Sequence, residues 1–291
     1  MLQLAGLVLV IAIIAGALFV SGGQAILSAL PFELALIGGA AVATLMIGNA
    51  PKVAKAAVLG MGRAMRGAKW SRREYQSLLV TLHELSRRAR RGGIVAIEQD
   101  IEAPDDSALF QQNRALLDDP EATALICDGF RMMAMDPAAQ SRLRVQLEEQ
   151  VASMVEERQR AANALHTLAD ALPALGIVAA VLGIIKTMGF IDSEPAILGD
   201  MIAAALLGTF LGVFLAYGIV GPIAARLTQV IEEEALYLDA IRDVLSGHAE
   251  GLAPRVSLEL ARNRLPNHLR PVIGDLDTSL TEARFAARKA A

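Results

Sequence analysis

The stretch MIAAALLGTFLGVFLAYGIVGPIAA, residues 201–225, contains no charged residue and is long enough to cross a bilayer as one helix. Before it, Ala171–Ile191 is equally apolar and carries only Lys186, close to one end. The chain of 291 residues is 54% hydrophobic but only 4% aromatic, and its apolar residues gather in such blocks instead of recurring at the periods of a soluble fold. The composition therefore predicts a polytopic membrane protein with a substantial water-facing part.

Two further apolar blocks lie near the N-terminus. Leu4–Val20 carries no charge, and Leu34–Gly48 reaches the ~20 residues of a span with flanking residues from Phe32 to Ala50. Residues 1–20 lack the basic segment of a cleaved signal peptide, so a membrane anchor is favoured. Because backbone groups in hydrocarbon must bond internally and the pattern does not alternate as in a barrel, we predict four transmembrane helices.

The predicted spans contain almost no ionisable residue. A protein that moves protons or cations needs a titratable or coordinating group at membrane depth, and these segments provide no carboxylate there. Either the chain moves no ions, or another chain supplies the group. The single Cys127 excludes an internal disulfide, the four histidines lack metal-ligand spacing, and no nucleophile with a paired base indicates an enzyme. We predict no metal and no cofactor.

Lysines and arginines near the span ends indicate the orientation. Seven of them follow the second span: Lys52, Lys55, Arg63, Arg66, Lys69, Arg72 and Arg73. The loop between the first two spans has none, and the loop after the third span is acidic. We therefore expect both termini in the cytoplasm. The expected domains are transmembrane helices 1 and 2 (1–50), a cytoplasmic helical domain (51–170), transmembrane helices 3 and 4 (171–225), and cytoplasmic C-terminal helices with a tail (226–291).

The water-facing part shows helical periods and no repeated strand signal, so the predicted fold class is all-α. Residues 72–91 place leucines on one side and arginines elsewhere, and Gly92-Gly93 ends this pattern. Residues 121–135 and 137–170 are predicted as further helices, and the second of these runs directly into the third span. After about Leu276 the tail has no strong apolar pattern and is open to disorder or adaptable structure.

A cluster of charge follows the first cytoplasmic helix. Its basic members are Arg87, Arg88, Arg90 and Arg91, and its acidic members are Glu98, Asp100 and Glu102. One interpretation is a solvated surface, and the other is a docking surface of both signs for a partner that binds and releases quickly. Nucleic acid is disfavoured, because the basic run has no interleaved aromatics and acidic residues follow at once.

Small residues recur at helical spacing in the last two spans: Gly176, Ala179, Ala180 and Gly183 in the third, and Ala204, Gly208, Gly212 and Ala216 in the fourth. Such faces let helices approach closely, either within the chain or as a lining around a separate helix. Pro173 and Pro222 lie at the cytoplasmic ends of these spans, and each removes a backbone donor. Thr209 and Tyr217 are polar groups between them; together these residues predict a partly polar route, unless Thr209 merely bonds its own helix.

These residues also carry a resemblance to a known family. The runs LPALGIVAAVLGIIKTMG (172–189) and LLGTFLGVFLAYGIVGPIA (206–224) strongly resemble the two C-terminal spans of the flagellar motor stator A subunit, the MotA/PomA family. The N-terminal FVSGG, ALPFELALIGGA and MIGN and the cytoplasmic RRGGIVAIEQDIEAP are similar to that family too, over about residues 1–265. The wider MotA/TolQ/ExbB proton channel superfamily includes transducers with three spans.

The resemblance implies a function in the bacterial inner membrane. Five copies would surround two copies of a MotB-like B subunit, which bears the membrane aspartate and a peptidoglycan anchor, and ion passage would turn the ring. It implies that Arg90 and Glu98 contact a FliG-like rotor protein, although the doubled arginines leave open which of them makes the contact. It also implies that Pro173 and Pro222 form the channel mouth and that Thr209 is the channel threonine. Ala179-Ala180 stands where sodium-driven members have a threonine, which favours protons.

The sequence is also compatible with two alternatives. A TolQ- or ExbB-like transducer would energise an outer-membrane process, and the paired N-terminal spans argue against it. A non-conducting membrane scaffold with a charged docking domain is the second alternative.

Overall fold

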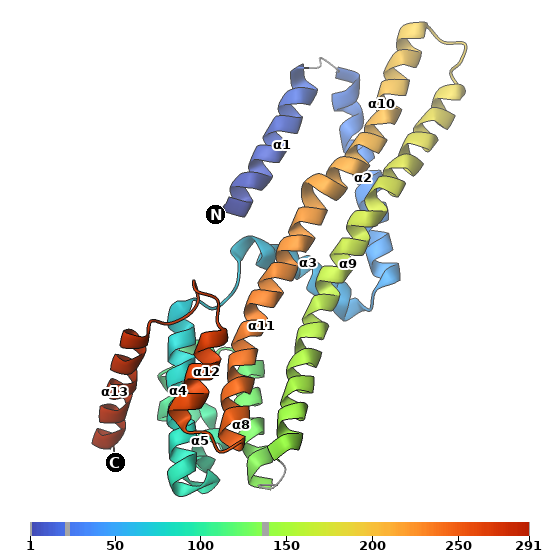
Figure 1. The fold of residues 1–291 in the computed structure, drawn as a ribbon. Helices are drawn as coiled ribbons and strands as arrows, with labels where there is room; N and C mark the ends of the chain where they lie inside the picture. The colour runs from blue at the N-terminus through green and yellow to red at the C-terminus, as the bar shows by residue number, and fades with distance from the viewer. Residues whose placement is uncertain (1, 21–23, 136–139, 291) are drawn as a thin grey trace. The chain divides into compact units, whose positions relative to one another are not determined.

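The computed structural model describes residues 2–20, 24–135 and 140–290, and every regular element in these ranges is a helix (Figure 1). The contacts divide the chain into two units. The first comprises Met1–Gly67 and Glu157–Ile231, and the second comprises Ala68–Glu156 and Glu232–Ala291. The all-α prediction is confirmed for the described residues.

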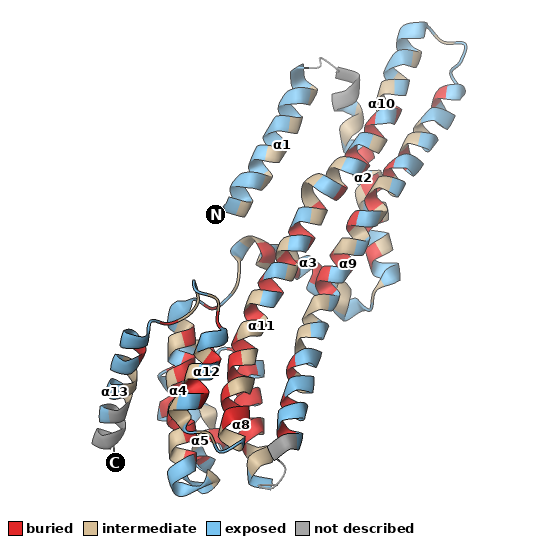
Figure 2. Cartoon of the chain, in the orientation of Figure 1, coloured by how far each residue is buried: buried red, intermediate tan, exposed pale blue. Residues whose placement is uncertain are grey.

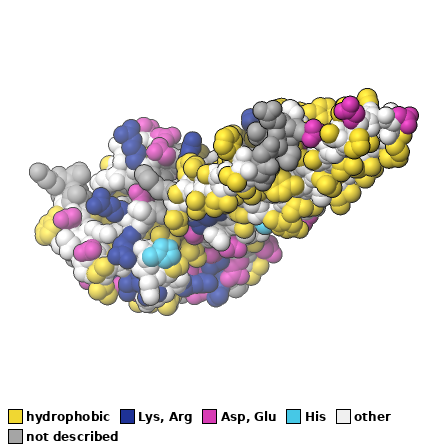
Figure 3. Space-filling model, turned by 90° about the horizontal axis from the view of Figure 1, so that it is seen from above, with side chains coloured by type: hydrophobic (Ala, Val, Ile, Leu, Met, Phe, Trp, Pro, Cys, Tyr) yellow, Lys and Arg dark blue, Asp and Glu magenta, His cyan; other side chains and the backbone are white. Residues whose placement is uncertain are grey.

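The first unit contains four helices that are long and apolar enough to cross a membrane. They are α1 (Leu2–Val20), α2 (Gln24–Gly48), the C-terminal part of α9 (Gln140–Met188) and α10 (Pro195–Phe214), which continues through the π-helical turn η3 (Leu215–Val220) into α11 (Gly221–Ala249). Most of their large apolar side chains are exposed (Figure 2), and hydrophobic side chains cover one part of the molecular surface almost without interruption (Figure 3). An apolar surface of this extent needs a lipid or protein partner, which confirms the four predicted spans.

One sequence-based inference about the spans is wrong. The second candidate span runs from Ser28 to Gly48 and includes Glu33, which also lies within the predicted limits once the flanking residues from Phe32 are counted. Glu33 is 5% exposed, packed inside the first unit. A carboxyl group therefore lies within a segment that is long and apolar enough to cross a membrane, and the inference that the spans contain none is wrong.

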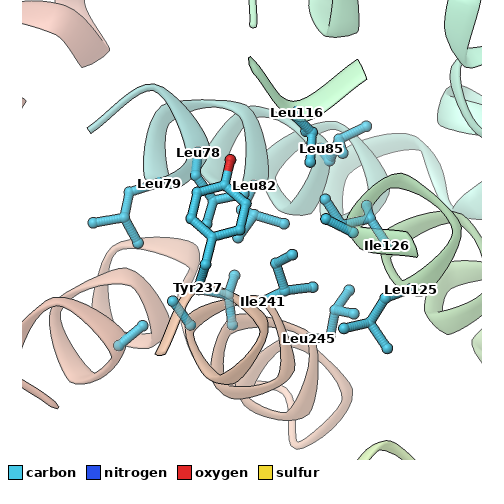
Figure 4. Close-up of a cluster of buried hydrophobic side chains, with 14 of the residues drawn as sticks. Leu78, Leu79, Leu82, Leu85, Leu116, Leu125, Ile126, Tyr237, Ile241 and Leu245 are labelled. Carbon is cyan, nitrogen blue, oxygen red and sulfur yellow. The ribbon is translucent and has the colours of Figure 1, made fainter. Parts of the chain in front are cut away.

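The second unit has its own core. The helix α4 (Arg72–Gly92) begins with a capping box in which the Ser71 and Glu74 side chains bond each other's backbone. Leucines 78, 79, 82 and 85 of α4 pack against α8 (Pro120–Met135) and the C-terminal half of α11, as Figure 4 shows. The amphipathic period predicted for residues 72–91 therefore marks a buried face.

Shorter elements complete this unit. They are η1 (Ile94–Ile97), α5 (Glu98–Glu102), η2 (Pro104–Asp106), α6 (Ala108–Gln111), α7 (Arg114–Leu117), α12 (Pro254–Arg264) and α13 (Ile273–Ala290). The tail after Leu276 belongs to the helix α13, in which Leu276 is fully buried. Because α13 packs against α4, the order of this tail comes from a contact that is distant in sequence.

The helix α9 is continuous over 49 residues, which confirms the predicted run from the water-facing part into the third span. Its predicted start at residues 137–139 lies outside the described residues. The remaining helix, α3 (Pro51–Arg66), follows the second span, and Pro51 stands in its first turn, where a missing backbone donor costs nothing.

Candidate functional site

The site begins where α9 and α10 come into backbone contact. A methyl group placed on Gly176 of α9 would lie 2.7 Å from the carbonyl oxygen of Gly208 and 2.9 Å from Cα of Gly212, both in α10. One placed on Gly212 would lie 2.7 Å from the carbonyl oxygen of Leu172. No side chain fits between these atoms, so glycine is required at these positions for the two helices to meet.

The same contact continues toward the other end of α9. A methyl group on Gly183 would lie 2.6 Å from Cβ of Ala205. Of the remaining predicted small residues, Ala204 is half-buried and Ala216 is fully buried. Packing within the chain thus accounts for the four glycines Gly176, Gly183, Gly208 and Gly212, and their contact with a partner helix stays a prediction.

Glu33 lies at this crossing. A methyl group on Gly208 would lie 3.0 Å from Oε2 of Glu33, 3.1 Å from Cβ of Ala179 and 3.2 Å from the backbone nitrogen of Ala180. The two alanines that the sequence singles out for the ion pathway, the glycine and the carboxyl group therefore meet at one level of the unit. Sequence reasoning overlooked Glu33 because only the uncharged run Leu34–Gly48 was considered when carboxyl groups were sought; the flanked span from Phe32 to Ala50 already contains it.

The polar residue next to Gly208 is Thr209, and its hydroxyl makes no hydrogen bond to any described residue. Other threonines of the first unit behave differently: Thr44 and Thr187 donate to the carbonyl oxygens of Ala40 and Gly183, each 2.9 Å away, one turn earlier in their own helices. The simple interpretation of a back-bonded threonine therefore does not describe Thr209. Its half-buried hydroxyl is available to a group outside the described contacts.

The two prolines interrupt their helices differently. Pro173 stands inside the continuous helix α9, and Pro222 is the second residue after the π-helical turn η3. A proline cannot donate to the preceding turn, and a π-turn is one way in which a helix adapts to a missing bond. Tyr217, within η3, is 71% exposed. With Pro222 it lines a cavity of about 340 Å³ against Gln3, Gly6 and Val10 of α1.

The four arginines of the charged cluster have different surroundings in the second unit. Arg87 forms an ion pair with the buried Glu84 (Nη2–Oε2 2.6 Å), and Arg88 pairs with Asp100 (Nη1–Oδ2 3.1 Å). Arg90 donates from Nη1 to the carbonyl oxygens of Gly251 and Leu252, at 2.9 and 2.6 Å. It thus satisfies carbonyls just beyond the end of α11. Arg90 and Arg91 are both exposed, and among the described residues Arg91 makes neither an ion pair nor a side-chain hydrogen bond.

Glu98, the predicted acidic contact, is exposed at the first position of α5. A carboxylate in a first helical turn is favoured by the helix dipole. Among the described residues no group of three or more His, Cys, Asp or Glu side chains is arranged to hold a metal ion. The charged surface therefore offers side chains of both signs to a macromolecular partner.

Comparisons with known proteins agree with this arrangement. Two family models match the chain: the motility protein A N-terminal model over residues 4–93, and the MotA/TolQ/ExbB proton channel family over residues 118–240. Motility protein A of Salmonella typhimurium is 32% identical over 286 residues, covering 98% of this chain and 96% of that protein. Motility protein A of Escherichia coli is 32% identical over 279 residues, covering 95% and 94%.

Two solved structures share the fold. The structure of C. jejuni MotAB superposes with a TM-score of 0.71 at 22% identity, covering 91% of this chain and 95% of that chain. The flagellar MotAB stator complex from Bacillus subtilis gives a TM-score of 0.69 at 24% identity, covering 90% and 95%. At this identity the likeness shows the fold.

Proposed function

The chain belongs to the MotA/TolQ/ExbB proton channel family, in its motility protein A branch, and we propose that it works as the A subunit of a flagellar stator. It conducts protons together with a partner subunit and is not an enzyme. The observation that carries this function is the match to motility proteins along nearly the whole chain, which includes both N-terminal spans as well as the two spans at the glycine crossing.

The partner is a MotB-like B subunit with one membrane helix that bears an aspartate. Five copies of this chain surround two copies of that subunit, which is anchored to peptidoglycan. Protonation of the aspartate neutralises a charge that is costly in the membrane and lets the surrounding helices repack. Thr209 supports a route of this kind, because its hydroxyl is not used by its own helix, and Ala179-Ala180 supports protons over sodium because it offers no side-chain oxygen.

Movement reaches the water-facing part through the helices that enter it. Both α9 and α11 begin or end in one unit and continue into the other, and each has a proline near the level where the span starts or ends. Pro173 and Pro222 are therefore the positions at which repacking bends these helices. The charged cluster then contacts a FliG-like rotor protein.

Within that cluster Arg90, Arg91, Glu98 and Glu102 are exposed. Arg90 and Glu102 are engaged in hydrogen bonds or ion pairs within the chain, which supports Arg91 and Glu98 as the members that meet the rotor directly. Arg90 supports this surface indirectly, because its hydrogen bonds hold the segment after α11. Arg87 and Arg88 support it through their ion pairs with Glu84 and Asp100. The basic residues after the second span support an orientation with both termini and the charged cluster in the cytoplasm, and with the chain in the bacterial inner membrane.

The transducer alternative loses support at the N-terminus, because the family model that matches residues 4–93 describes the N-terminal part of motility protein A.

An experiment distinguishes the proposed stator function from the scaffold alternative. The gene is deleted in a flagellated host, and the chain is also co-expressed with its B subunit while proton flux is measured with the partner's aspartate intact or changed to asparagine. Loss of swimming and an aspartate-dependent flux are expected. Normal swimming, or flux that is independent of that aspartate, overturns the proposal.

A further inference from the structure

Glu33 is a buried carboxyl group that the motor mechanism above does not use. It lies in α2, five residues into the second span, about 8 Å along the helix from Ser28. It is 5% exposed, and its Oε2 has no hydrogen-bond partner. A buried polar atom without a partner costs free energy, so its presence needs a reason.

The helices around Glu33 provide no counter-charge for it. Within the spanning segments, α1 carries no charge, α10 carries Asp200 near its start, and α9 carries Lys186 near its end. The helix α3, which follows α2, carries Lys52, Lys55, Arg63 and Arg66, beyond the other end of the span. None of these groups forms an ion pair or a hydrogen bond with Glu33 in the described residues.

Chemistry limits what such a group can do. Taking an ionised carboxylate out of water without a partner is costly, and a buried carboxyl binds a proton instead. A group that gains and loses one proton within a membrane marks proton relays, and an intramembrane carboxyl without a structural partner fits that use. The group also lies at the level of the glycine crossing, since its Oε2 is the atom nearest to the position of a methyl group on Gly208.

We propose that Glu33 is a second proton-carrying group of the channel, which relays protons beside the crossing formed by Gly208, Ala179 and Ala180. This inference rests on the proposed function. In the relay Oε2 accepts one proton from water on the side of the loop between α1 and α2. It then gives that proton to the carboxylate of the partner subunit's membrane aspartate, so the Glu33 carboxyl group itself is unchanged after each passage.

The experiment uses the full chain assembled with its B subunit. Three variants are compared with the wild type: E33Q keeps the shape but does not titrate, E33D titrates but is shorter, and E194Q makes the same change at an exposed carboxylate before α10. Proton flux is measured in vesicles as a function of pH, and assembly of each complex is checked by size-exclusion chromatography. We expect E33Q to lower flux by about tenfold or more, E33D to recover part of it, and E194Q to match the wild type.

A second measurement, infrared difference spectroscopy, does not depend on proton transport. Infrared difference spectra of wild type against E33Q isolate the carbonyl band of the protonated Glu33 carboxyl, which we expect to change on titration with pH. Wild-type flux in E33Q overturns the inference, and so does equal loss in E33Q and E33D with the complex assembled, because side-chain length would then matter and the proton would not. Absence of flux in the wild type would instead reject the proposed function.

Discussion

The glycine crossing of α9 and α10 predicts a sharp response to one methyl group. In the variant G212A the new Cβ lies 2.7 Å from the carbonyl oxygen of Leu172 and 2.8 Å from Cα of Gly176. Non-bonded carbon atoms prefer separations of about 3.5–4.0 Å, so the helices must part by roughly 0.7 Å at this point. Both obstacles are backbone atoms of a helix, which cannot rotate away as a side chain would.

The magnitude follows from two opposing contributions. Overpacking of a tight contact costs ~1–3 kcal/mol, and alanine regains up to ~1 kcal/mol because it suits a helix better than glycine does. We therefore expect G212A to lower the free energy of unfolding by ~1–2 kcal/mol. Separation of α9 from α10 at Gly212 also loosens the contact of Ala179 with Gly208, one helical turn away. We therefore expect proton flux to fall in the same variant.

The matched control is G199A, in the same helix. Gly199 is exposed, and a methyl group there meets no atom within 4 Å. Unfolding of the full chain in detergent, followed by hydrogen exchange of the α9 and α10 amides, measures both variants. The reasoning is refuted if G212A is as stable as G199A and exchanges no faster at the crossing.

Three further predictions concern the second unit. R90A, which removes the donor to the carbonyls beyond α11, should lower the free energy of unfolding by ~1 kcal/mol, whereas R91A should not change it; equal effects in denaturant titrations would contradict this. Cys127 is buried, and burial raises the pKa of its thiol to about 11, so iodoacetamide should label it slowly in the folded chain and fast in denaturant; fast labelling of the folded chain would disprove its burial. Burial lowers the pKa of His83 and of His248 below the ordinary value of about 6.5. Just below that pH the unfolded chain therefore binds more protons than the folded chain does. Stability should therefore be retained above that pH and fall as the pH drops through it, and unfolding titrations of the H83Q/H248Q double variant should show a flatter pH dependence; an unchanged slope would contradict the assignment.

Much of the architecture could be predicted because it depends on local pattern. The length of an apolar run determines whether a segment can span a bilayer, and a leucine repeat such as that of residues 72–91 determines which face of a helix is buried. For the same reason the continuity of α9 was predictable: no proline or glycine pair interrupts the charged segment before the third span. The tail was not predictable, since the helix α13 is ordered by packing on α4, nearly two hundred residues earlier in the chain.

The candidate site divides in the same way. The sequence by itself determined the spans, the small-residue faces and the charged cluster, because composition and spacing are properties of consecutive residues. Only the tertiary structure decided that Gly176 and Gly212 touch, that Arg90 holds the segment beyond α11 and that Glu33 is buried against Gly208. Each of these depends on which faces of distant segments oppose one another, and the free energy of such contacts is not contained in any one stretch of the chain.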